Sequence, residues 1–216
     1  LEKVREEIAT AGGAATAHPC DIRDEDQVLA TVEAVLATHG RIDGLVNNAG
    51  GQFPSPLRDI SLKGWEAVVR TNLTGGFLVA RECYRRWMEA NGGAIVNMSA
   101  DMWGGMPGMA HSGAARAGMV NFTESAACEW AASGVRVNAV APGNVATPMT
   151  AKFELPSNLD RALFMRLSSL LKAPDGQSGA AAQPGEIAGA IAYLASPEAA
   201  FVTGSVFVID AGQTAI

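Results

Sequence analysis

The sequence predicts an α/β fold with a doubly wound, mostly parallel sheet, and three observations predict it. Short apolar runs alternate with longer amphipathic segments along the 216 residues, as in strand–helix–strand units. The apolar runs are unbroken, as expected for strands that are buried on both faces. Polar and glycine-rich clusters follow several runs, at the strand ends where open α/β sheets bind ligands. We expect one domain over residues 1–216, with a variable region at about 149–183.

The first half of the chain is predicted to contain three helices and two strands. Residues 1–11 place apolar side chains on one helical face, and residues 14–20 follow as a short strand. Residues 25–39 form a second helix, which an aspartate caps and a glycine ends. A buried strand lies within residues 42–47, and a long helix covers residues 61–90.

The second half continues the alternation. A strand over residues 94–98 leads through a loop rich in glycine and methionine to the longest helix, over residues 110–131. The strand over residues 135–140 ends in Ala-Pro-Gly. After the variable region, a helix over residues 186–195 precedes a last strand over residues 205–209.

The composition excludes several classes of function. With a net charge of −6 and no basic block, the chain is a poor partner for nucleic acid or an anionic membrane. Its three cysteines are widely spaced, which argues against a disulfide framework and indicates a reducing compartment such as the cytoplasm. The three histidines show no ligand spacing, so we expect no metal site. No apolar run reaches about 18 residues, the length that a membrane span requires.

Ser99, Ser112 and Arg116 are expected to converge on one crevice. Ser99 stands at the carboxyl end of its strand, and Ser112 and Arg116 are four residues apart on one face of the next helix. Glycines at 50 and 143 allow the backbone to approach a flat ligand at two strand ends. Asn and Gly are also common in ordinary turns after strands. Five such clusters at matching positions along the chain nevertheless favour a cofactor site.

Together these residues resemble the short-chain dehydrogenase/reductases over nearly the whole chain. The matching pieces are Asp21 after a strand, Asn47-Asn48-Ala49-Gly50, Asn72 in Thr-Asn-Leu-Thr-Gly, Ser99, Arg136 to Gly143, Thr147 and Val202-Thr203-Gly204. The resemblance implies a Rossmann-like fold, an NADP(H) or NAD(H) cofactor and a homo-oligomer, in this family often a tetramer. It places Asp21 and Ile22 beside adenine, Asn48, Ala49 and Gly50 along the adenosine ribose, and Pro142, Gly143, Val145 and Thr147 on the nicotinamide side. The catalytic positions are Asn72, Ser99, Ser112 and Arg116, and Arg116 also holds the cofactor.

The chain departs from the family pattern at its active site. The family has a Tyr four residues before a Lys, and here these positions hold Ser112 and Arg116. The two tyrosines, Tyr84 and Tyr193, lie on helices away from the crevice. The phenol that protonates an alkoxide during carbonyl reduction is therefore missing.

One branch of the family also has Ser at that position, the enoyl-CoA and 2,4-dienoyl-CoA reductases. Residues 111–118 resemble the peroxisomal-type trans-2-enoyl-CoA reductases, including the Arg. The resemblance implies reduction of a carbon–carbon double bond conjugated to a thioester, in fatty acid metabolism. Hydride addition there places negative charge on the thioester oxygen, which needs positioned donors more than a strong acid. Ser112, Ser99 and the Arg116-anchored ribose could supply these donors.

The proton donor stays open. The substitute tyrosines of the two branches fall on Asp101 and Val120, so neither is present. His111 could relay a proton, or it could be a capping or surface residue. The rival functions are a carbonyl or alcohol oxidoreductase with an atypical acid, and a dinucleotide-binding protein without catalysis.

Three further clusters allow two interpretations each. Met98, Met102, Met106 and Met109 could line an acyl groove or pack within their loop. Apolar residues between Phe153 and Leu167, including Leu155, could form a lid or cover the core. Arg81, Arg85 and Arg86 could meet the phosphates of CoA or form a solvated helix face.

The printed chain also lacks the family's first strands and their Gly-rich turn. We therefore expect about 40–50 further residues upstream, since the first strand is central in this topology. In the printed chain alone, the strand at 14–20 would have no neighbour, and the strand at 42–47 would present an unpaired apolar edge.

Overall fold

The computed structural model describes residues 1–148, 150–152, 154–160, 162 and 181–215. Its centre is a sheet in the order β1 (Gly44–Asn47), β2 (Gly93–Met98), β3 (Val135–Pro142) and β4 (Val206–Ile209). All three strand pairings are parallel, with Val46 beside Val96 and Ala139 beside Val206. The parallel sheet confirms the predicted fold class.

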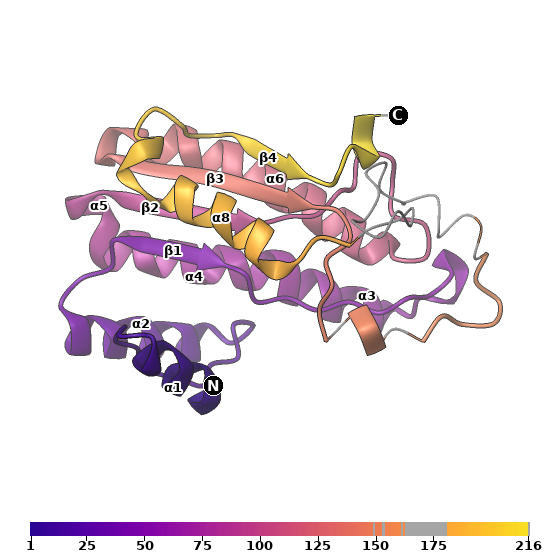
Figure 1. The fold of residues 1–216 in the computed structure, drawn as a ribbon, viewed down its shortest axis with the longest axis horizontal. Coiled ribbons are helices and arrows are strands. Elements are labelled where there is room, and N and C mark those ends of the chain that lie inside the picture. Colours follow the sequence, from indigo (N-terminus) through magenta and orange to yellow (C-terminus); the bar gives the residue numbers. More distant parts are fainter. Residues whose placement is uncertain (149, 153, 161, 163–180, 216) are drawn as a thin grey trace.

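Helices cover both faces of the sheet (Figure 1). The helices α4 (Gly75–Cys83) and α6 (Ala110–Trp130) pack on one face, and α8 (Pro184–Ala195) packs on the other. Neighbouring residues of β2 point in opposite directions: Ile95 joins the core under α4 and α6, whereas Val96 packs with Ile187 and Leu194 of α8. Burial on both faces explains why the strand sequences are unbroken apolar runs.

The predicted long helix at 61–90 forms, but it is not uniformly α-helical. The helix α3 (Leu62–Val69) begins at Ser61, whose hydroxyl accepts a hydrogen bond from Gly64 N at 3.1 Å. One π turn at Arg70–Thr74 leads into α4, and a second at Tyr84–Met88 leads into α5 (Glu89–Asn91). A π turn widens a helix locally and is often found at functional sites. The first of these turns carries Asn72, which is buried.

The N-terminal part differs from the prediction at residues 14–20. Helices α1 (Glu2–Thr10) and α2 (Glu25–His39) form, and Asp24 caps α2 by accepting bonds from two backbone amides. Residues 14–20 form no strand, because no described strand lies beside them to accept their hydrogen bonds. The apolar run within residues 42–47 forms β1 at the edge of the described sheet, with Val46 44% exposed, as expected for a strand without a neighbour on that side in the printed chain.

Two remaining expectations concern the lid and the membrane. Most of the predicted lid region at 149–183 lies outside the described residues, including Phe153, Phe164, Met165 and Leu167. Leu155 is described, and it lines a cavity. In the described part of the chain, no helix has the length and apolar character that a bilayer span needs.

Candidate active site

Two adjoining cavities open at the carboxyl ends of β2 and β3. We call them the Arg116 cavity, of about 190 Å³, and the Asp101 cavity, of about 340 Å³, after one residue in the wall of each. They share the wall residues Gln52, Ala100, Pro142, Gly143, Val145 and Thr150. A molecule bound in one cavity would therefore contact a molecule bound in the other.

Arg116 is a half-buried cation with few acceptors. It reaches from α6 toward the end of β2, where Nη1 donates to Met98 O at 2.5 Å and Nη2 donates to Asn72 Oδ1 at 3.0 Å. Burial lowers the pKa of Arg116 to about 10. Its Nε–H is buried and has no hydrogen-bond partner among the described residues. The guanidinium therefore has capacity for a hydrogen-bond acceptor that enters the cavity.

Asn72 ties Arg116 to the loop after β1. Its Oδ1 accepts from Gly51 N at 3.1 Å and from Arg116, while its Nδ2 donates to Gly51 O at 2.7 Å and to Val68 O at 3.0 Å. A Cβ on Gly50 would lie 2.5 Å from Asn72 Oδ1 and 2.9 Å from Arg116 Nη2. Gly50 therefore lies close to these two side chains, and its predicted close approach to a flat ligand stays a prediction.

The two predicted serines lie beside the cavities in different ways. Ser99 lines the Arg116 cavity, and its hydroxyl donates to Arg116 O at 3.2 Å. Ser112 is fully buried and is not a wall residue of either cavity. Its hydroxyl donates to Oε1 of Gln52, which lines both cavities. Sequence reasoning missed Gln52, although its place directly after the Asn-Ala-Gly-Gly turn was an available signal.

His111 is a core residue rather than a surface or capping residue. It is fully buried, and its ring meets Phe53 edge-on at 4.5 Å between centroids. Burial lowers its pKa, which favours the neutral form, and Nδ1 accepts from Ser112 N at 3.0 Å. Its ring is not part of either described cavity wall.

The residues predicted to bind adenosine separate into two groups. Ile22, Asn48 and Ala49 line a small third cavity of about 100 Å³, which shares Asn48 with the Arg116 cavity. Asp21 lies instead in an exposed hollow beside Arg23. Hydrogen bonds from Arg23 at 2.7 and 2.8 Å hold the pKa of Asp21 near 2. The place of Asp21 beside adenine stays a prediction, since an exposed carboxylate that accepts from Arg23 can still accept from an amine.

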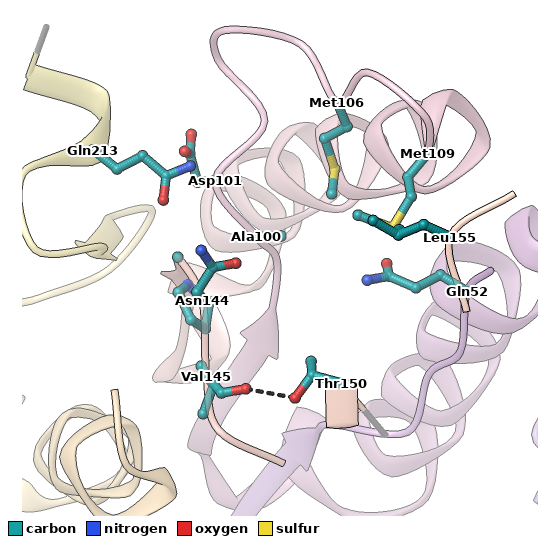
Figure 2. Close-up of a pocket in the computed structure, with 12 residues that line it drawn as sticks. Gln52, Ala100, Asp101, Met106, Met109, Asn144, Val145, Thr150, Leu155 and Gln213 are labelled. Atoms are coloured by element: carbon teal, nitrogen blue, oxygen red, sulfur yellow. Dashed lines mark hydrogen bonds between the residues drawn. The ribbon is translucent and has the colours of Figure 1, made fainter. Parts of the chain in front are cut away.

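The Asp101 cavity has one apolar and one polar side (Figure 2). Met106, Met109 and Leu155 form the apolar side, which supports the interpretation of these two methionines as groove residues. Met98 lines the Arg116 cavity, whereas Met102 lines neither.

Asp101 and Gln213 form the polar side of the Asp101 cavity (Figure 2). Asp101 is only 7% exposed, and burial together with the neighbouring charge of Asp210 raises its pKa. Oε1 of Gln213 is buried without a hydrogen-bond partner among the described residues.

The arginine cluster and the tyrosines lie outside the site. Arg81, Arg85 and Arg86 each pair with at least one carboxylate, and all three surround Glu82, which is 3% exposed. This favours a structural helix face over a phosphate site. Tyr84 stacks on Trp130 at 4.3 Å, and Tyr193 lies on α8 beside Phe207.

The chain is similar in sequence and structure to proteins that are named as reductases or dehydrogenases. A family described as Enoyl-(Acyl carrier protein) reductase matches residues 1–214. The cis-4-hydroxycyclohexanecarboxylate dehydrogenase of Sinomonas cyclohexanicum is 41% identical, over 91% of this chain and 75% of its own length. A probable 2,4-dienoyl-CoA reductase of Bacillus subtilis (strain 168) is 33% identical, over 99% of this chain and 82% of its own. A solved structure, the citronellol catabolism dehydrogenase of Pseudomonas aeruginosa PAO1, has a TM-score of 0.81 and 50% identity, over 99% of this chain and 79% of its own.

Proposed function

Because this chain belongs to the short-chain dehydrogenase/reductase family and is an NAD(P)(H)-dependent oxidoreductase, we propose that it reduces the carbon–carbon double bond of an enoyl thioester, most simply an enoyl-CoA. One observation carries the proposal. The family's tyrosine position holds Ser112, whose hydroxyl is buried against Gln52, and no tyrosine stands in the described walls of the two cavities. The site therefore offers neutral hydrogen-bond donors where carbonyl reduction would use a phenol.

The described residues fit a nicotinamide cofactor in the Arg116 cavity. The unpartnered Nε–H of Arg116 can donate to a ribose hydroxyl, and no described heavy atom lies within 4 Å of the position a Cβ would take on Gly51. Asn48 and Ala49 continue this surface toward Ile22. When bound, the cofactor supplies a hydride to the substrate. Asn72 holds the guanidinium, and Val145 and Thr147 line the same cavity.

The Asp101 cavity suits the acyl part of the substrate. Met106, Met109 and Leu155 exclude water and contact an apolar chain. Gln52 extends its amide into the cavity (Figure 2), and the Ser112 hydroxyl fixes the orientation of that amide by bonding to Oε1. The Nε2–H group of Gln52 is then a donor for the thioester oxygen, where negative charge develops. We propose that Ser112 acts through Gln52 in this way.

A second candidate, an alcohol or carbonyl oxidoreductase, is favoured by two relatives. The names of the Sinomonas and Pseudomonas proteins describe dehydrogenases, and the latter shares 50% identity with this chain. A third candidate is a family member that binds the cofactor without catalysis. We further propose that the enzyme acts as a homotetramer in the cytoplasm, in fatty acid metabolism.

The three candidates are separated by one screen of cofactor oxidation. Crotonyl-CoA tests the double bond, and acetoacetyl-CoA is the matched ketone that keeps the same thioester. A cyclic ketone acid and a terpenoid aldehyde test the activities that the relatives' names suggest. Oxidation of NADPH or NADH by crotonyl-CoA alone is the expected result. Turnover of the ketones without turnover of crotonyl-CoA would favour the second candidate, and binding without turnover on the whole panel would favour the third.

A further inference from the structure

The reduction of a double bond requires a proton as well as a hydride, and one carboxyl group borders the cavity. Asp101 follows β2, and its backbone N–H donates to Pro142 O at 2.9 Å, which fixes the residue at the carboxyl end of the sheet. Its side chain is 7% exposed and lines the Asp101 cavity. Among the described wall residues of both cavities, Asp101 is the one acidic group, and neither Lys nor His is present.

Asp210 keeps a negative charge close to Asp101. Burial by itself raises the pKa of Asp210, but hydrogen bonds from Thr214 N, Thr214 Oγ1 and Gly212 N outweigh burial and lower it. The ionised form of Asp101 is stabilised by a hydrogen bond from the backbone N–H of Trp103, which is less than Asp210 receives. Burial and the charge of Asp210 therefore raise the pKa of Asp101. Two carboxyl groups with opposite shifts indicate one ionised group and one proton donor.

The position of Asp101 suits proton delivery. Figure 2 shows Asp101 and Gln213 on one side of the cavity and Gln52 on another, with open space between them. The buried Oε1 of Gln213 has no hydrogen-bond partner among the described residues, which marks this polar side as a place for a polar group of a ligand. A thioester that accepts a bond from Gln52 would present the atoms next to its carbonyl to Asp101.

From this arrangement we infer that Asp101 is the catalytic residue that donates the proton in the reduction. The inference rests on the proposed function. Hydride addition breaks the cofactor's C–H bond, forms a C–H bond at the β-carbon and moves the double-bond electrons into an enolate. The enolate α-carbon then takes the proton of the Asp101 carboxyl group, which is left as a carboxylate. Solvent protonates the carboxylate again before the next turnover, so one proton is consumed for each cofactor oxidised.

The first test is Asp101→Asn, which keeps the shape of the side chain and removes its proton. Turnover should fall by roughly 10²- to 10⁴-fold, the usual contribution of a general acid. The dissociation constant of NADPH or NADH should stay unchanged, because Asp101 does not line the Arg116 cavity. Turnover equal to that of the parent, on a substrate that the parent accepts, would overturn the inference.

The matched control is Asp210→Asn, which keeps Asp101 and removes the charge beside it. The turnover of the parent should fall as pH rises through the raised pKa of Asp101, since the protonated form is the active one. In Asp210→Asn this alkaline limb should move to lower pH. A structural role for either carboxyl group would lower activity without moving the limb, and an unmoved limb would overturn the inference.

A stability measurement tests the proton without activity. A carboxyl group whose pKa is raised in the folded state stabilises the protein at low pH. This contribution is lost as pH rises above the pKa in the unfolded chain, near 3.8. Asp101→Asn does not lose this contribution. The melting temperature of Asp101→Asn minus that of the parent should therefore increase as pH rises. A difference that is constant with pH would overturn the inference. Because this readout needs no substrate, it distinguishes failure of the inference from failure of the proposed function, which the substrate screen reports.

Discussion

Arg116→Met should weaken cofactor binding while leaving the fold almost as stable as before. The pKa of Arg116 falls from 12.5 to about 10, so burial of the cation costs about 3 kcal/mol at roughly 1.4 kcal/mol per unit. Met removes that cost and fills similar space. Against this gain, Met98 O and Asn72 Oδ1 each lose one donor, at about 1–3 kcal/mol apiece, although Asn72 Oδ1 keeps Gly51 N. The free energy of unfolding should therefore change by no more than about 3 kcal/mol.

Cofactor affinity should respond much more strongly. A hydrogen bond from a charged group contributes about 1.5–3 kcal/mol, so loss of the guanidinium should raise the NAD(P)H dissociation constant roughly 10- to 150-fold. Fluorescence titration measures this constant, and urea unfolding measures the stability of the same samples. Arg116→Lys is the control, since it keeps the charge without the planar fork and should be milder. A Met variant with an unchanged dissociation constant would refute the assignment of Arg116 to the cofactor.

Three other predictions concern the serine, the glycine loop and the assembly. Ser112→Ala should lower turnover by about 10²-fold with little change in cofactor affinity, and more than His111→Asn does; steady-state kinetics equal to the parent would remove Ser112 from the mechanism. Gly50→Ala should weaken cofactor binding about tenfold or more, since its Cβ would displace Asn72 or Arg116, whereas Gly189→Ala on α8 is the matched control, with no heavy atom within 4 Å of its Cβ position and no place in either cavity wall. Light scattering at micromolar concentration should show a tetramer, because apolar surface stays exposed on the helix layer, such as Phe77 of α4 at 38%; a monomer would contradict this.

Local sequence patterns predicted most of the fold. The unbroken runs at β2 and β3 and the periodicity of α6 depend on neighbours in the chain, and these elements form within two residues of their predicted bounds. The strand at 14–20 does not form because a strand also needs a partner, and the described sheet offers none beside it, as the family layout had indicated for the printed chain. The π turn around Asn72 was missed because its residues have the same helical pattern as the α turns on either side.

The site was predictable where motifs set it and unpredictable where tertiary neighbours set it. Spacing alone brought Ser99 and Arg116 to one cavity with Asn48, Gly50 and Thr147. It could not show that Gln52 covers Ser112, sixty residues away. It also gave no sign that Asp210, near the other end of the chain, changes the protonation of Asp101. Electrostatic neighbours of this kind are properties of the folded chain.

The bonding of Asn72 restricts what evolution or a designer can place at that position. Its oxygen faces two N–H groups, and its nitrogen faces the carbonyls of Gly51 and Val68. An aspartate of the same shape would turn an oxygen toward both carbonyls, and a leucine would remove all four of these hydrogen bonds. The Asn72 side chain therefore satisfies these groups in one orientation of its amide, and no side chain of the same shape can replace it. Any scheme that transplants this cofactor site to another scaffold must carry the widened helical turn along with the asparagine, since a regular turn would aim the amide elsewhere.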